Sequence, residues 1–185
     1  MRPRELADQL GISEAQLLAA VVGQGVTPIH PHPDQVMHAA ASLGEVMALT
    51  RNESCVHEKI GVYDNYHTGH HAAMVLTEDI DLRIFPSHWR HAFAVEQEVE
   101  GSLRRSLQVF DAAGDSIHKV FVRDADVDHA WATIQSEIAL PDPVDHLAVA
   151  KRQPPEQPKS DASKVEILRK EWTRMTDTRQ FLRLT

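Results

Sequence analysis

The middle of the chain, residues 45–122, alternates between apolar and polar side chains with a period of two and is rich in β-forming residues. Runs of this kind predict strands with one face toward a core. The last two runs are separated by Ala112-Ala113-Gly114-Asp115, which is typical of a hairpin turn, so we expect an antiparallel sheet. There are about seven runs, at 46–50, 56–63, 72–76, 80–85, 92–99, 106–110 and 117–122.

Helical spacing of apolar residues appears on both sides of this region. Two short helices are expected near 5–10 and 15–21, with Gly11 between them and Ser13 capping the second. Two more are expected at 35–43 and at 127–140. The sequence therefore predicts an α+β fold, in which helices flank one large antiparallel sheet.

We expect one domain over residues 1–140, including the N-terminal helical segment, and a linker over 141–163, where five prolines stand among polar residues. Residues 164–185 read as a helical tail. Its apolar stripe is Val165, Leu168, Trp172 and Met175, and a further helix would contain Phe181 and Leu182. This stripe must pack on the domain, dock on another subunit or belong to a second domain.

Composition narrows the classes of function. A formal net charge of −8 argues against broad binding to nucleic acid. The opening helix, turn and helix resemble the start of a DNA-binding motif, but the second helix, 13–22, contains no Lys or Arg. No apolar run predicts membrane insertion or a secretory signal, and Cys55 is the single cysteine, so we expect a cytoplasmic protein.

One predicted strand places a cation beside an aromatic ring. In the run 81–85, alternation sends Leu82 and Ile84 to one face and Asp81, Arg83 and Phe85 to the other. A guanidinium next to a ring suits a flat anionic ligand. The alternative is an ordinary surface on which Asp81 neutralises Arg83.

A second strand collects polar groups of mixed chemistry. Alternation over 55–63 brings His57, Lys59 and Tyr63 to one face, where they could ligate iron and hold carboxylates, or form a solvated sheet face. His67, His70 and His71 give only a weak zinc signal. Basic residues on the hairpin arms could add charge to a carboxylate pocket or form salt bridges; they are Arg104, Arg105, His118 and Lys119.

Several of these segments together resemble the N-terminal half of the HemS/HmuS hemin-degrading family. The resemblance covers most of residues 1–140 and is carried, in order, by 10–15, 43–53, 56–59, 81–85 with 88–89, 105–111 and 118–120. It implies a repeat built from a large antiparallel sheet with flanking helices. Family members are about twice this length and contain two such repeats, while short ChuX-like relatives pair as homodimers, so a homodimer is expected here.

The resemblance also implies a ligand, haem, held between a sheet and helices with Arg83 and Phe85 on its distal side. His57 is a secondary candidate for the iron ligand, and Lys59 for a propionate contact. The tail segment 172–181 matches the family's pattern, with Arg179 at the position of the family's axial histidine. A guanidinium stays protonated and does not donate a lone pair to iron.

Three functions stay open at this point. The first is haem binding and trafficking in bacterial iron acquisition, with haem as the ligand and a haem-pathway protein as a further partner. The second is an enzyme that opens the porphyrin oxidatively. The third is a structural partner that does not bind haem.

Overall fold

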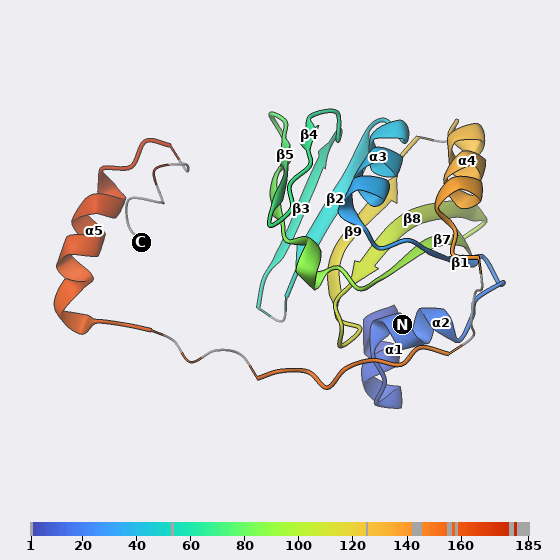
Figure 1. Ribbon diagram of the computed structural model, residues 1–185, viewed down its shortest axis with the longest axis horizontal. Coiled ribbons are helices and arrows are strands. Elements are labelled where there is room, and N and C mark those ends of the chain that lie inside the picture. The colour runs from blue at the N-terminus through green and yellow to red at the C-terminus, as the bar shows by residue number, and fades with distance from the viewer. Residues whose placement is uncertain are drawn as a thin grey trace. The chain divides into compact units, whose positions relative to one another are not determined.

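The structure, a computed structural model, describes residues 2–52, 54–124, 126–141, 146–154, 157, 159–177 and 180. By contacts the chain divides into two compact units, Met1–Arg152 and Gln153–Thr185. The first unit contains both sheets and most of the helices (Figure 1). Each unit is described by itself.

The first unit is built on a six-stranded antiparallel sheet with the strand order β1-β7-β8-β9-β2-β3. A smaller three-stranded sheet has the order β4-β5-β6. The strands of the large sheet are β1 (Val26–Ile29), β2 (Val46–Arg51), β3 (Val56–Gly61), β7 (His91–Val99), β8 (Ser102–Phe110) and β9 (Ser116–Val122). Those of the small sheet are β4 (Tyr66–His67), β5 (Ala73–Leu76) and β6 (Asp81–Ile84). The predicted α+β fold with a large antiparallel sheet is confirmed.

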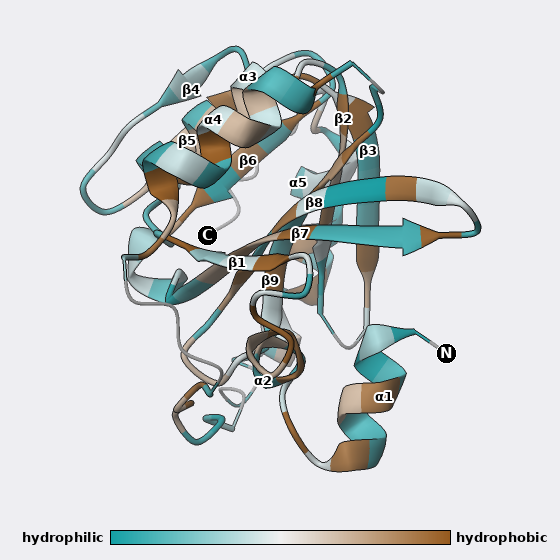
Figure 2. Cartoon of the chain, turned by 90° about the vertical axis from the view of Figure 1, so that its right-hand side faces the viewer, coloured by the Kyte–Doolittle hydropathy of each residue, from teal (hydrophilic) through white to brown (hydrophobic). Residues whose placement is uncertain are grey.

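Helices cover both faces of the large sheet (Figures 1 and 2). The larger core cluster joins the sheet to α3 (Pro33–Ser42), α4 (Asp128–Ile138) and the small sheet. A second cluster joins the opposite face to α2 (Glu14–Ala19), which follows α1 (Pro3–Leu10). As predicted, Ser13 caps α2, accepting a hydrogen bond from the Gln16 N–H.

The alternation in β8 explains why the sheet has two cores. Leu107 and Val109 are fully buried in the larger cluster, whereas Phe110, one residue on, packs against Phe93 in the second cluster. Successive side chains of a strand point to opposite faces, so one strand supplies both cores. Trp131 of α4 fills the larger cluster.

Two strands were not predicted, and one is longer than predicted. β1 is a short edge strand that contains Pro28, a residue that argues against a strand by pattern alone. β4 is two residues long, too short to show a period. β8 begins at Ser102, because its first four residues pair with the end of β7 across a tight turn at Gly101.

The chain stays with the first unit beyond Leu140. Leu147 packs against the cluster around α2, and the Ala150 N–H donates a hydrogen bond of 2.7 Å to the Ala112 carbonyl.

In the second unit, α5 (Val165–Thr173) follows a 3-10 turn over Ala162–Lys164. Exposed apolar residues on α5 are Val165, Ile167, Leu168 and Trp172. The predicted helix with Phe181 and Leu182 lies outside the described residues. No helix in the described part of the chain is long and apolar enough to span a bilayer.

Candidate functional site

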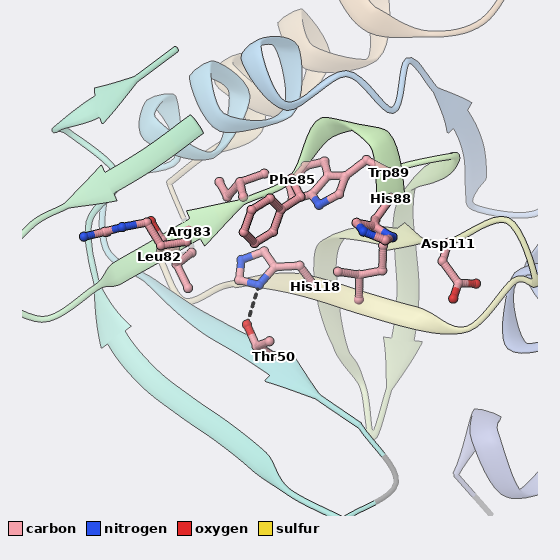
Figure 3. Close-up of a pocket in the computed structure, with 10 residues that line it drawn as sticks. Thr50, Leu82, Arg83, Phe85, His88, Trp89, Asp111 and His118 are labelled. Atoms are coloured by element: carbon pink, nitrogen blue, oxygen red, sulfur yellow. Dashed lines mark hydrogen bonds between the residues drawn. The ribbon is translucent and has the colours of Figure 1, made fainter. Parts of the chain in front are cut away.

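A cavity of about 260 Å³ opens between the small sheet and the large one (Figure 3). Its walls come from β6, from the 3-10 turn that follows it (Pro86–His88), and from the adjoining parts of β2 and β9. The lining is mostly apolar and aromatic. It consists of Thr50, Leu82, Arg83, Ile84, Phe85, His88, Trp89, Asp111, Ile117 and His118.

His118 lies in the cavity wall with both ring nitrogens engaged. Its Nδ1 lies 2.8 Å from the Thr50 hydroxyl, and its Nε2 lies 2.6 Å from the Tyr63 hydroxyl. The Trp89 ring stacks on the imidazole, with centroids 6.4 Å apart and planes 21° from parallel. Burial lowers the pKa of His118 to about 4, so the imidazole is neutral at pH 7. The site therefore presents a fixed, uncharged aromatic wall.

The alternation predicted for β6 is confirmed by its burial, since Ile84 is buried and Asp81 and Arg83 are exposed. The Arg83 guanidinium pairs with the Asp81 carboxylate at 2.6 Å and extends away from the rings of the cavity (Figure 3). Phe85 stands over the cavity and is 52% exposed, with its ring edge-on to His88. The residues of β6 and the turn after it thus provide an uncovered ring at the cavity and, at its rim, a guanidinium that Asp81 neutralises, as the alternative reading of the sequence expected.

The group predicted around His57 is divided by the structure. β3 is an edge strand, and His57 and Lys59 are both exposed on it. Residue pairing sets His57 opposite Thr50, hence on the same face of the sheet, but His57 does not line the cavity. Lys59 pairs with Asp79 at 2.9 Å. Tyr63 is buried and turned toward His118 instead.

Three cavity residues were not selected as site residues from the sequence. His118 was expected only as one of the basic residues that could add charge to a carboxylate pocket, and the structure corrects this, because the buried imidazole is neutral at pH 7. A buried Trp in a β-rich region, such as Trp89, reads as core. His88 is exposed at the cavity rim, next to Phe85. The signal that could have identified it is its spacing, three residues after Phe85 and directly before Trp89. A single 3-10 turn brings residues three apart to the same side, so His88 and Phe85 lie next to each other.

The remaining predicted sites are placed as follows. Arg179 lies outside the described residues. Arg105 forms ion pairs with Glu96 and Asp128, and its guanidinium lies over the Trp131 ring. It therefore holds α4 against the large sheet and does not line the cavity. No group of three or more His, Cys, Asp or Glu side chains suited to a metal ion occurs among the described residues.

Comparison with known proteins places this site in a family. The profile of the haemin-degrading HemS.ChuX domain matches residues 11–138. The hemin transport protein HmuS of Yersinia pestis is 36% identical over 183 residues, which is 98% of this chain and 52% of HmuS. Holo-PhuS, a heme-binding protein of Pseudomonas aeruginosa, superposes with a TM-score of 0.81 at 35% identity, over 100% of this chain and 54% of PhuS.

A third solved structure, ChuS, described as an E. coli heme oxygenase, has a TM-score of 0.70 at 29% identity, over 98% of this chain and 53% of ChuS. The chain spans about half the length of these relatives. The matched residues 11–138 hold both sheets and every residue that lines the cavity. The chain therefore belongs to the haemin-degrading HemS.ChuX domain family.

Proposed function

We propose that this domain binds haem at the cavity between its two sheets and serves to carry it. The observation that supports this most directly is the layer of rings formed by Phe85, Trp89 and His118. The Arg83 guanidinium at the rim is exposed and paired with Asp81, and it would exchange that carboxylate for a propionate. A porphyrin is flat, apolar over its faces and anionic at its propionates. Stacked rings and a guanidinium match those two properties.

The size of the cavity fits part of the ligand. Ligand sites usually measure about 300–1,000 Å³, and this one encloses about 260 Å³. We expect one edge of the macrocycle to enter between Leu82 and Ile117, while the rest of its face lies against the exposed Phe85 ring. The remaining face would be covered by a second repeat or a second copy of the chain.

Among the described residues at the cavity, His88 is the side chain best suited to ligate iron. Its imidazole is exposed, and within the described part of the chain it contacts the Phe85 ring without forming a hydrogen bond. His118 has both nitrogens engaged and would have to break its bond to Tyr63 or Thr50. His57 remains a further proposed ligand, and Lys59 and Arg179 remain proposed contacts for the propionates.

Titration with haem tests the proposal. We expect a Soret band that shifts on binding at micromolar protein, and a loss of affinity of about tenfold or more in Phe85→Ala and Arg83→Ala. His88→Ala should change the Soret position, because it removes an iron ligand. His129→Ala, an exposed histidine on α4 away from the cavity, is the matched control. An unshifted Soret band in the unmodified protein would refute haem binding.

Porphyrin opening is the second candidate function, favoured by the likeness to ChuS. It needs an electron donor and oxygen in addition to bound haem. Incubating the haem complex with ascorbate, with catalase present to remove free peroxide, separates the two. Loss of the Soret band would establish degradation, whereas an unchanged band would leave binding and transport.

We also propose that residues 1–140 form one repeat and that residues 141–163 connect it to a helical tail that resembles the start of a second repeat. We propose that the protein acts in the cytoplasm. Where no second repeat is present, we propose that it acts as a homodimer. The side of the large sheet that carries α2 has partly exposed apolar residues, namely Met47, Leu49, Ile60 and Phe121. A second copy would cover them. Sedimentation of the unmodified chain and of Ile60→Glu tests this, and a monomer in both cases would exclude the dimer.

A further inference from the structure

The walls of the cavity between the two sheets belong to the packed core of the first unit. Ile84 and Trp89 are buried in the larger core cluster, and Leu82 and Ile117 pack against that cluster while part of their surface stays exposed. All four side chains line the cavity. Because a close-packed core holds its side chains in fixed positions, the shape of the cavity exists before a ligand arrives. Such a cavity can discriminate between groups of similar size and different polarity.

The buried imidazole in the wall has no nitrogen left for a ligand. His118 Nδ1 lies 2.8 Å from the Thr50 hydroxyl, and His118 Nε2 lies 2.6 Å from the Tyr63 hydroxyl. Burial lowers the pKa of this imidazole to about 4, so it is neutral at pH 7. A polar ligand group would have to break one of these two hydrogen bonds in order to pair with the imidazole. The wall therefore favours a group that needs neither a hydrogen bond nor a counter-charge.

The charged groups of the lining stand at its ends. At one end, the exposed Arg83 guanidinium pairs with Asp81 at 2.6 Å and extends away from the rings (Figure 3). At the other end, the Asp111 carboxylate accepts hydrogen bonds from the backbone N–H groups of Ala113 and Asp115, both at 2.9 Å. A second carboxylate that entered the cavity would be repelled by Asp111. Burying a carboxylate without a cation beside it is costly, and the Trp89 indole in the same wall is a neutral donor.

Haem has two chemically different sides. Both propionates of protoporphyrin stand on one side of the macrocycle, and both vinyl groups stand on the other. A vinyl group is apolar and makes no hydrogen bond, whereas a propionate is an anion. The two sides of the ligand therefore differ in the property by which the cavity discriminates.

We propose that the cavity receives the vinyl-bearing side of haem, and that Leu82 and Ile117 are the side chains that determine this orientation. The inference rests on the proposed haem binding and adds which side of the macrocycle is buried. The propionates then point out of the cavity, toward the rim where Arg83 is exposed. The opposite orientation would bring a propionate to the neutral imidazole of His118 and the carboxylate of Asp111.

Titration with haem, mesohaem and haematohaem tests the inference through the Soret band. Mesohaem carries ethyl groups and haematohaem carries 1-hydroxyethyl groups in place of the vinyl groups, while the propionates are the same in all three. We expect mesohaem to bind within about threefold of haem, and haematohaem to bind about tenfold or more weakly, because its hydroxyls enter an apolar wall. Equal affinities of haem and haematohaem, with a clear Soret shift for both, would overturn the inference and leave the proposed function standing.

Leu82→Thr tests the side chains assigned to the orientation. Threonine suits a strand and adds a hydroxyl to the cavity. We expect weaker haem binding and a preference for haem over haematohaem of about threefold or less, whereas a loosened cavity would weaken both ligands and keep their ratio. Leu103→Thr is the matched control, because Leu103 is an exposed residue of β8 that does not line this cavity.

Thermal unfolding of each variant shows whether it folds, and Ile117→Thr makes the same test where Leu82→Thr does not fold. A ratio of affinities that is unchanged in both variants would overturn the role of these two side chains.

Zinc protoporphyrin reports the orientation directly, because it is diamagnetic and its protons can be observed by NMR. We expect nuclear Overhauser effects between the vinyl protons and the methyl groups of Leu82 and Ile117. The same effects from the propionate methylene protons would overturn the inference. If neither haem nor zinc protoporphyrin shows a Soret shift with the unmodified protein, the proposed function is refuted and the inference is refuted with it.

Discussion

The buried imidazole of His118 predicts a specific loss of stability in mild acid. In the unfolded chain this histidine titrates near its ordinary pKa of 6.5, whereas in the folded protein burial lowers its pKa to about 4. Between those values the unfolded state binds more protons than the folded state. The contribution of His118 to the unfolding free energy therefore rises with pH from about 4 to 6.5 and is lost as the solution is acidified.

The magnitude follows from the two pKa values. At 1.36 kcal/mol per pH unit, the difference between 6.5 and about 4 corresponds to about 3 kcal/mol of unfolding free energy. That contribution is present in full above pH 6.5 and absent below the folded pKa, where both states are protonated. For a domain with the usual stability of about 5–15 kcal/mol, this is a large fraction.

Urea denaturation at a series of pH values measures it, with His118→Gln as the comparison. Glutamine keeps a donor and an acceptor for Tyr63 and Thr50 but does not titrate. His91, whose pKa is also lowered by burial, is present in both proteins, so its contribution cancels in the difference. We expect the difference in unfolding free energy to change by about 3 kcal/mol across this range. Equal pH dependence in the two proteins would refute the reasoning.

Three further substitutions test other buried contacts of the first unit by chemical denaturation. Tyr63→Phe should cost about 1–3 kcal/mol, because His118 Nε2 loses its buried partner; no change would mean that water replaces the phenol. Glu14→Gln should cost about 3–5 kcal/mol by leaving two buried cations unpaired, and a neutral effect would contradict the assigned charges. Gly25→Ala should cost about 1–3 kcal/mol, since its φ is 77° and a Cβ would stand 2.2 Å from a carbonyl oxygen of β7. Gly23→Ala, at φ 82° with open space around it, should cost less.

Most of the fold could be predicted because its signals are local. The period of two marks the long strands, and the hairpin turn at Gly114 fixes that two of them are antiparallel. β1 could not be predicted, because it is held in place by its pairing with β7 and by the hydrogen bond from Leu140 to the Pro28 carbonyl. Those contacts join residues far apart in the chain, so the sequence near Pro28 does not show them.

The site could be predicted only in part, for the same reason. Alternation placed Asp81 and Arg83 on the face of β6 opposite Ile84, in agreement with the burial of the strand, whereas Phe85 lies one residue beyond the end of β6, in the 3-10 turn that follows it. It could not show that the 3-10 turn after β6 would bring Trp89 onto His118, which is 29 residues away in the chain. Nor could it divide His57 from Tyr63, since a strand that ends at Gly61 no longer alternates at residue 63.

The cavity lies between two sheets of unequal size, so the small sheet would open more readily when a ligand enters or leaves. The small sheet is held by few hydrogen-bonded pairs, because β4 contributes only two residues to it. Short pairings of this kind open more readily than the core of a larger sheet. We therefore expect amide protons of β5 and β6 to exchange with deuterium faster than those of β8. Local opening of the small sheet would then widen the cavity while the large sheet keeps its hydrogen bonds.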